Sequence, residues 1–71
     1  MEIKADLSGT VFKVLVHEGD IVAAGDEVMI LESMKMEIPV EATAPGRVAR
    51  ILVKPGDAIV DGQVLLEVDP A

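Results

Sequence analysis

The chain repeats itself at an offset of 37 residues. Aligning residues 2–34 with residues 39–71 gives eight identities in 33 pairs. Three of the identities are glycine pairs: Gly9/Gly46, Gly19/Gly56 and Gly25/Gly62. Glycine is favoured where the backbone takes a positive φ. Two copies with glycines at equivalent positions should therefore form turns at equivalent positions. Two copies are too few for a solenoid. We therefore expect each copy to bury its apolar face against the other around a pseudo-two-fold axis.

This symmetry makes a prediction about the middle of the chain. The first copy ends and the second begins between Met34 and Pro39, and Lys35 lies in this seam. Both termini map onto the same point of the repeat. If that point lies away from the axis, the seam and the termini occupy opposite ends of the molecule. Lys35 is therefore expected far from both termini.

The apolar runs between the glycine turns are short and rich in valine, isoleucine and leucine, which favours strands over helices. Turns are expected at 17–20 and 54–57, and again around Gly25 and Gly62. The expected strands lie near residues 2–5, 10–16, 21–22, 28–32, 36–40, 47–53, 58–60 and 64–68. Eight short strands at this spacing predict a single all-β domain, a small sandwich or flattened barrel.

Residues 26–37 give a conflicting signal. They are rich in Glu, Met, Leu and Lys, which favour a helix, and Pro39 would end that helix. However, residues 28–31 are continuously apolar and would spread around a helix rather than form one stripe. Their partners in the repeat, residues 64–68, are short and β-like. We predict strand, turn and strand, with a helix as the alternative.

Composition excludes several functional classes. The formal net charge is −7, which argues against nucleic acid, because phosphate binding requires clustered Lys and Arg. There is no cysteine and only one histidine, so no metal site is expected and His17 is expected to be solvated. No apolar run approaches the roughly 18 residues of a membrane span. No secretory signal is recognisable, and a cytoplasmic location is expected.

Several segments resemble a biotinyl domain of the biotin/lipoyl-attachment family, and the similarity covers almost all 71 residues. The segments are Ser-Gly-Thr-Val at 8–11, Glu-Gly-Asp-Ile-Val at 18–22, Glu-Ser-Met-Lys-Met-Glu at 32–37, Ala-Pro-Gly-Arg-Val at 44–48 and Pro-Gly-Asp-Ala-Ile at 55–59. The resemblance implies a barrel-sandwich hybrid of two four-stranded antiparallel sheets with pseudo-two-fold symmetry. It also implies one domain, 1–71, with an attachment hairpin around 33–37. No thumb insertion precedes the motif.

The resemblance assigns roles to the residues of that hairpin. Lys35 is implied as the site of covalent attachment, and Met34 and Met36 as flanking residues that the modifying ligase recognises. Glu32 and Glu37 are candidates for further recognition. Methionines on both sides of the lysine are typical of biotinyl members, whereas lipoyl members have Asp-Lys-Ala, so biotin is expected and lipoate is the alternative. Because strand neighbours alternate faces, one of the two methionines is expected to point partly inward.

The function implied by the resemblance is that of a biotin carboxyl carrier. A biotin protein ligase joins biotin to Lys35, and the biotinyl arm carries CO2 from a biotin carboxylase to a carboxyltransferase. Lysine is almost wholly protonated at neutral pH, and only the neutral amine is nucleophilic. Glu32 and Glu37 favour the charged form further, so the ligase must supply the activation. We expect no catalytic site in this chain and a monomer in isolation. A lipoyl carrier and an unmodified scaffold or interaction module are the alternatives.

Overall fold

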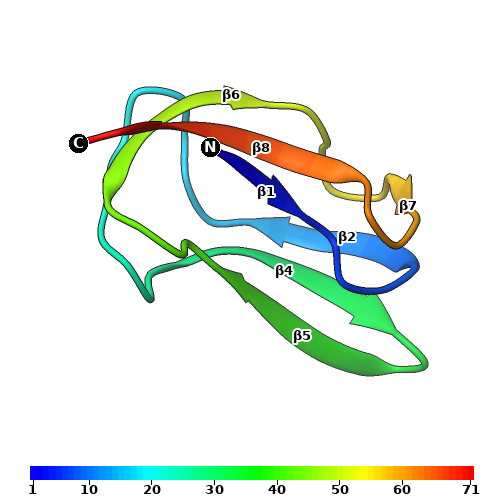
Figure 1. Ribbon diagram of the computed structural model, residues 1–71. Helices are drawn as coiled ribbons and strands as arrows, with labels where there is room; N and C mark the ends of the chain where they lie inside the picture. The colour runs from blue at the N-terminus through cyan, green and yellow to red at the C-terminus, as the bar shows by residue number, and fades with distance from the viewer.

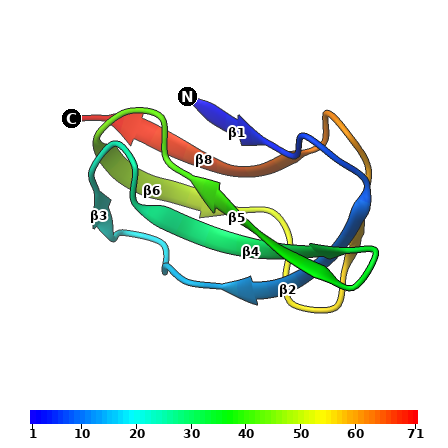
Figure 2. The same cartoon turned by 90° about the horizontal axis from the view of Figure 1, so that it is seen from below.

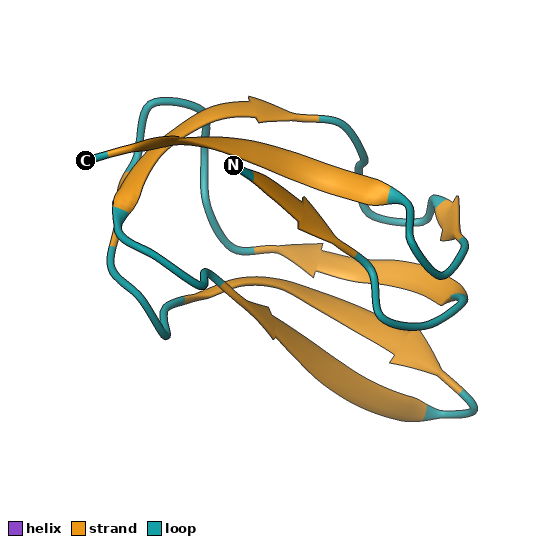
Figure 3. Ribbon diagram, viewed as in Figure 1, coloured by secondary structure: helices purple, strands orange, loops and turns teal.

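The valine-, isoleucine- and leucine-rich runs form eight short strands in the computed structural model, which describes residues 1–71 (Figure 1). The strands are β1 (Glu2–Lys4), β2 (Gly9–Val14), β3 (Ile21–Val22), β4 (Glu27–Ser33), β5 (Met36–Glu41), β6 (Gly46–Ile51), β7 (Ala58–Ile59) and β8 (Val64–Pro70). All of the elements are strands, joined by turns and loops (Figure 3). No helix is long and apolar enough to cross a membrane.

The strands form two four-stranded sheets, and every pairing is antiparallel. One sheet has the order β1-β8-β6-β3 and the other β5-β4-β2-β7. Figure 2 shows the two sheets enclosing a common interior. The predicted all-β architecture of two four-stranded antiparallel sheets is confirmed.

A shift of 37 residues exchanges the two sheets. It carries the bounds of β2, β3 and β4 onto those of β6, β7 and β8, and β1 onto the second half of β5. The order β1-β8-β6-β3 thereby becomes β5-β4-β2-β7. The predicted pseudo-two-fold symmetry is confirmed. Each sheet contains two strands from each half of the chain, so neither half forms a sheet of its own.

Glycines form the corresponding turns of the two halves. Gly19 and Gly56 both have a φ of 94°, and Gly25 and Gly62 have φ values of 91° and 89°. The backbone N–H of Gly19 donates to the carbonyl of Val48 at 2.7 Å, and the N–H of Gly56 donates to the equivalent carbonyl, that of Val11, at 2.8 Å. The turns of one half are thus hydrogen-bonded to strands of the other half.

The core lies between the sheets and consists of 14 buried hydrophobic residues. The largest fully buried side chains are those of Met29, Leu31, Leu65, Leu66, Val11, Val28, Val48 and Val68. In β4, Met29 and Leu31 face the core while Glu32 is exposed. β4 pairs antiparallel with both β2 and β5, and the adjacent buried residues Val28 and Met29 lie at an irregularity in its pairing with β5. Residues 26–37 therefore form strand, turn and strand, as predicted, rather than a helix.

The termini and the β4–β5 turn lie toward opposite ends of the long dimension of the domain, which measures 34 Å (Figure 1). The amino group of Met1 donates to the carbonyl of Val68 at 2.8 Å, which attaches the start of the chain to β8. The chain can therefore be held at its ends while the β4–β5 turn projects from the other end.

Candidate functional site

Met34 and Lys35 form a two-residue turn between β4 and β5. The pairing extends from Glu27 opposite Glu41 to Ser33 opposite Met36, next to the turn. Met34 and Lys35 have φ values of 53° and 65°. A two-residue hairpin loop with positive φ at both positions is a type I′ turn, whose twist matches that of the flanking strands. The hairpin therefore continues to its tip without splaying, and Lys35 stands at that tip.

This turn conformation does not match the preferences of its residues. Type I′ turns favour Asn-Gly or Gly-Gly, and a side chain at positive φ costs on the order of 1–3 kcal/mol. Met34 and Lys35 are the only residues other than glycine with positive φ in the chain. Their backbone strain is thus concentrated at the tip of the hairpin. Strain of this kind persists only where surrounding structure over-determines it, and it is common at functional sites.

The side chains around the tip are directed into solvent. Met34 is 92% exposed and Met36 is 64% exposed. Met36 shares the inward face of Ile38 and Val40 by alternation, but the core ends before it. The expectation that one methionine points partly inward is therefore met in direction only, because neither side chain is buried. Two exposed thioethers flanking an amine form a flexible apolar surface that can adapt to several partners.

Carboxylates lie on both sides of the tip. Glu32 and Glu37 are directly opposed in the pairing of β4 with β5, and both are exposed. Like charges at directly opposed positions are destabilising. The ion pairs of the structure are Lys4–Glu2, His17–Asp20 and Arg50–Glu67, so neither glutamate is neutralised and the Lys35 amine has no carboxylate partner. The five predicted site residues are thus brought together at one tip, with the amine free.

Hydrogen bonds attach the end of β4 next to the turn to two other loops. The Ser33 hydroxyl donates to the carbonyl of Ser8 at 3.1 Å, and the backbone N–H of Asp61 donates to the Ser8 hydroxyl at 3.1 Å. Sequence reasoning assigned no role to these three residues. The repeat gave no specific signal, because most of its 33 pairs differ and Asp61 contributes only a backbone N–H.

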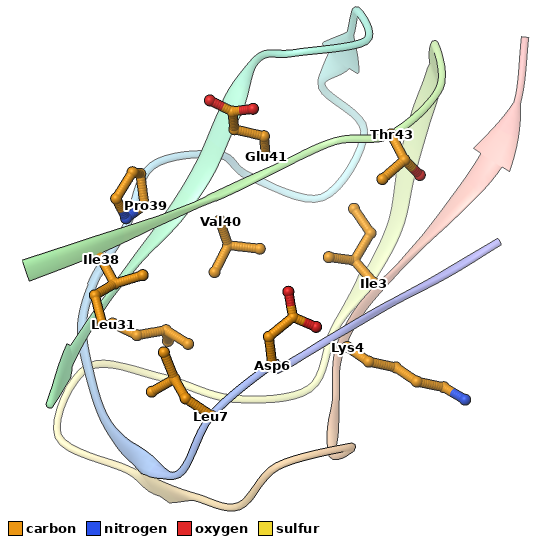
Figure 4. Close-up of a pocket in the computed structure, with 10 residues that line it drawn as sticks. All are labelled: Ile3, Lys4, Asp6, Leu7, Leu31, Ile38, Pro39, Val40, Glu41 and Thr43. Carbon is orange, nitrogen blue, oxygen red and sulfur yellow. The ribbon is translucent and has the colours of Figure 1, made fainter.

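A groove of about 440 Å³ lies between β1 and β5, where the two sheets do not pair (Figure 4). Leu7, Leu31 and Val40 converge on its centre, whereas Lys4 extends away from it (Figure 4). Met34, Lys35 and Met36 are not among the residues that line it. No group of three or more His, Cys, Asp or Glu side chains is placed to hold a metal ion. Lys35 differs from the other lysines by its place in the two-residue turn, and its free amine suits a group held by a covalent bond.

Comparisons with known proteins agree with this geometry. The family profile described as "Biotin-requiring enzyme" (Biotin_lipoyl) matches residues 1–68. The chain is 46% identical over 67 residues to a biotin/lipoyl attachment protein of Bacillus subtilis, covering 94% of this chain and 92% of that protein. It is 47% identical over 66 residues to the alpha3 subunit of a biotin-dependent acyl-coenzyme A carboxylase of Mycobacterium leprae, covering 93% of this chain and only 11% of that subunit.

A solved structure extends the likeness to three dimensions. The urea carboxylase of Kluyveromyces lactis matches with a TM-score of 0.92 and 36% sequence identity, over 97% of this chain and 6% of that one. The chain therefore spans nearly the whole of one small relative and a small fraction of the large carboxylases. On the profile match, the identity and the shared fold, the chain belongs to the biotin/lipoyl-attachment family, as a domain of the biotinyl type.

Proposed function

We propose that the chain is a biotin carboxyl carrier in which Lys35 holds biotin through an amide bond between its Nζ atom and the biotin carboxyl group. The observation that carries the proposal is the unpaired amine at the tip of a two-residue turn, between exposed methionines. Bound biotin supplies a ring nitrogen that takes up and gives back a carboxyl group. The domain has the role of a carrier, and it contributes no catalytic residue to that chemistry.

The residues around Lys35 present it to other proteins. A biotin protein ligase must deprotonate the amine, because only the neutral amine is nucleophilic and no base of this chain lies beside it. Met34 and Met36 offer an apolar surface that closes around a partner's active-site entrance. We propose the same tip as the part that enters a biotin carboxylase and a carboxyltransferase in turn. The tether keeps the attached group at a high effective concentration near both sites.

The carboxylases among the relatives support association with a carboxylase system. We propose that the partners are separate proteins or domains in the cytoplasm and that the isolated chain is monomeric. Acyl-coenzyme A and urea are the acceptors in the names of two relatives, of which this chain covers 11% and 6%.

The test is the intact mass of the chain after incubation with a biotin protein ligase, biotin and ATP. The wild-type chain should gain one biotinyl group, and Lys35→Ala should gain none while keeping its β-type far-ultraviolet spectrum. Lys54→Ala is the matched control, because Lys54 lies in an exposed turn on the other half of the repeat and should leave labelling unchanged. Labelling of Lys35→Ala, or gain of a lipoyl group instead when a lipoate ligase is supplied, would contradict the proposal.

A further inference from the structure

We infer that Ser8 and Ser33 are positioning residues that hold the β4–β5 hairpin, and Lys35 at its tip, in the orientation that partner enzymes bind. The inference rests on the function proposed above. Ser33 is the last residue of β4 and precedes the turn directly. Its hydroxyl donates to the Ser8 carbonyl, and the Ser8 hydroxyl accepts from the N–H of Asp61. Ser8 thus connects the hairpin to the loop after β1 and to the turn after β7.

The pseudo-symmetry of the domain provides an internal control for this network. The shift of 37 residues places Pro45, Pro70 and Ala24 at the positions equivalent to Ser8, Ser33 and Asp61. Proline at positions 45 and 70 has no hydroxyl to donate or accept a hydrogen bond, whereas Ala24 keeps a backbone N–H like the one that Asp61 uses. At the end of the domain that holds the termini, the Pro45 carbonyl instead accepts from the backbone N–H of Ala71 at 3.3 Å, so the same strands are built there without the two serine hydroxyl bonds. The fold does not require these hydrogen bonds at that end.

The two ends of the domain have the same close backbone packing. The serine hydrogen bonds are therefore what distinguishes the hairpin end. A Cβ atom at Gly9 would collide with the carbonyl oxygen of Glu32, and one at Gly46 would collide with that of Asp69, the equivalent residue. The chain thus approaches the end of β4 and the end of β8 equally closely. Only at the hairpin end are serine hydroxyls added to this close contact. Only that end carries the lysine.

The strain in the turn explains why the hairpin needs such support. Met34 and Lys35 gain conformational freedom if the pairing of Ser33 with Met36 opens, because their positive φ values can then relax. Ser33 is one member of that pair, and its hydroxyl attaches the pair to the loop that contains Ser8. This hydrogen bond opposes the opening. A partner that binds only the closed hairpin has its apparent affinity reduced by the fraction of open hairpins. Loss of the serine hydroxyls should therefore raise the KM of the ligase for this chain and leave kcat unchanged.

The experiment compares Ser33→Ala, Ser8→Ala and the conservative Ser33→Thr, with Thr43→Ala as the control. Thr43 is exposed, and its hydroxyl contacts the sulfur of Met1 at 3.3 Å, away from the hairpin. Loss of one net hydrogen bond should raise the opening equilibrium of the hairpin about fivefold in each serine-to-alanine variant. KM for biotinylation should rise in proportion to the closed fraction that is lost, by at most about fivefold. Ser33→Thr and Thr43→Ala should retain the wild-type KM. The urea midpoint of each variant is measured as well. It distinguishes a rise in KM caused by hairpin opening from one caused by a general loss of stability.

Amide hydrogen exchange provides a second readout that does not depend on the ligase. In Ser33→Ala and Ser8→Ala the backbone amides of the terminal pair, Ser33 and Met36, should exchange about fivefold faster, while those of Leu66 and Val68 in β8 stay unchanged. Unchanged KM together with unchanged exchange would overturn the inference, as would an equal rise in exchange throughout both sheets. If the wild-type chain is not biotinylated at Lys35, the proposed function fails. The exchange result then still decides whether the serines hold the hairpin.

Discussion

At the scale of single residues, the informative contrast is between the two kinds of residue at positive φ. Gly19, Gly25, Gly56 and Gly62 take this conformation at no steric cost. Met34 and Lys35 take it against their preference, in a turn where glycine or asparagine would fit better. If position 35 is modified, a lysine is required there, and the proposed chemistry explains why this strained position is not a glycine. Met34 has no such requirement, and its exposed side chain supports the proposed role in recognition by a partner.

Met34→Gly tests this reasoning. Replacing the strained side chain should stabilise the domain by about 1 kcal/mol, measured as a higher urea midpoint at the same m-value. Biotinylation by the ligase should become less efficient, since the exposed thioether is lost. Gly19→Ala is the counterpart, because a Cβ there would meet nothing within 4 Å and the backbone alone is strained. It should destabilise the domain by about 1–2 kcal/mol and leave biotinylation intact. A stability loss in Met34→Gly would contradict the assignment of strain.

At the scale of elements, the strand pattern could be predicted because glycines and short apolar runs mark it directly. The eight strands were predicted within a few residues of their bounds, and the tight turn at Met34 and Lys35 followed from the repeat. The pairing irregularity between Val11 and Lys13, repeated between Val48 and Arg50, could not be predicted. A bulge depends on the register of the partner strand, and local sequence contains little information about that register. The bonds of Ser8 were missed because they depend on which loops and turns meet in the folded chain.

Two substitutions in β5 can separate the effect of charge on stability from an effect on recognition by the ligase. Glu32 opposes Glu37 near the tip, and Glu27 opposes Glu41 at the other end of the hairpin. Glu37→Lys and Glu41→Lys each turn a like-charge pair into an attractive pair. Each should raise the free energy of unfolding by about 0.2–1 kcal/mol in urea titrations at low salt. Only Glu37→Lys should slow biotinylation, if the ligase reads the carboxylate beside Lys35. Equal rates in wild type and both variants would exclude a recognition role for Glu37.

At the scale of the whole molecule, the two halves of the chain are interleaved rather than adjacent. Each sheet takes strands from both halves, and the turns of one half donate hydrogen bonds to the other. Core positions also correspond, as Val11 does to Val48, Leu31 to Val68 and Met29 to Leu66. The two ends are therefore equivalent in packing and differ in their side chains at the surface. The proposed attachment site lies at one end of this symmetric scaffold, and both chain termini lie toward the other (Figure 1).

Met29 and Leu66 offer a test of this interleaving, because they occupy equivalent core positions in opposite sheets and are both 0% exposed. Met29→Ala and Leu66→Ala should each destabilise the domain by about 2–5 kcal/mol. If the halves form one cooperative unit, each variant should still unfold in a single transition, coincident by circular dichroism and by exchange in both sheets. Well below the transition, biotinylation should proceed at the wild-type rate, since Lys35 lies outside the core. A variant that loses one sheet while the other persists would show that the two halves are separable.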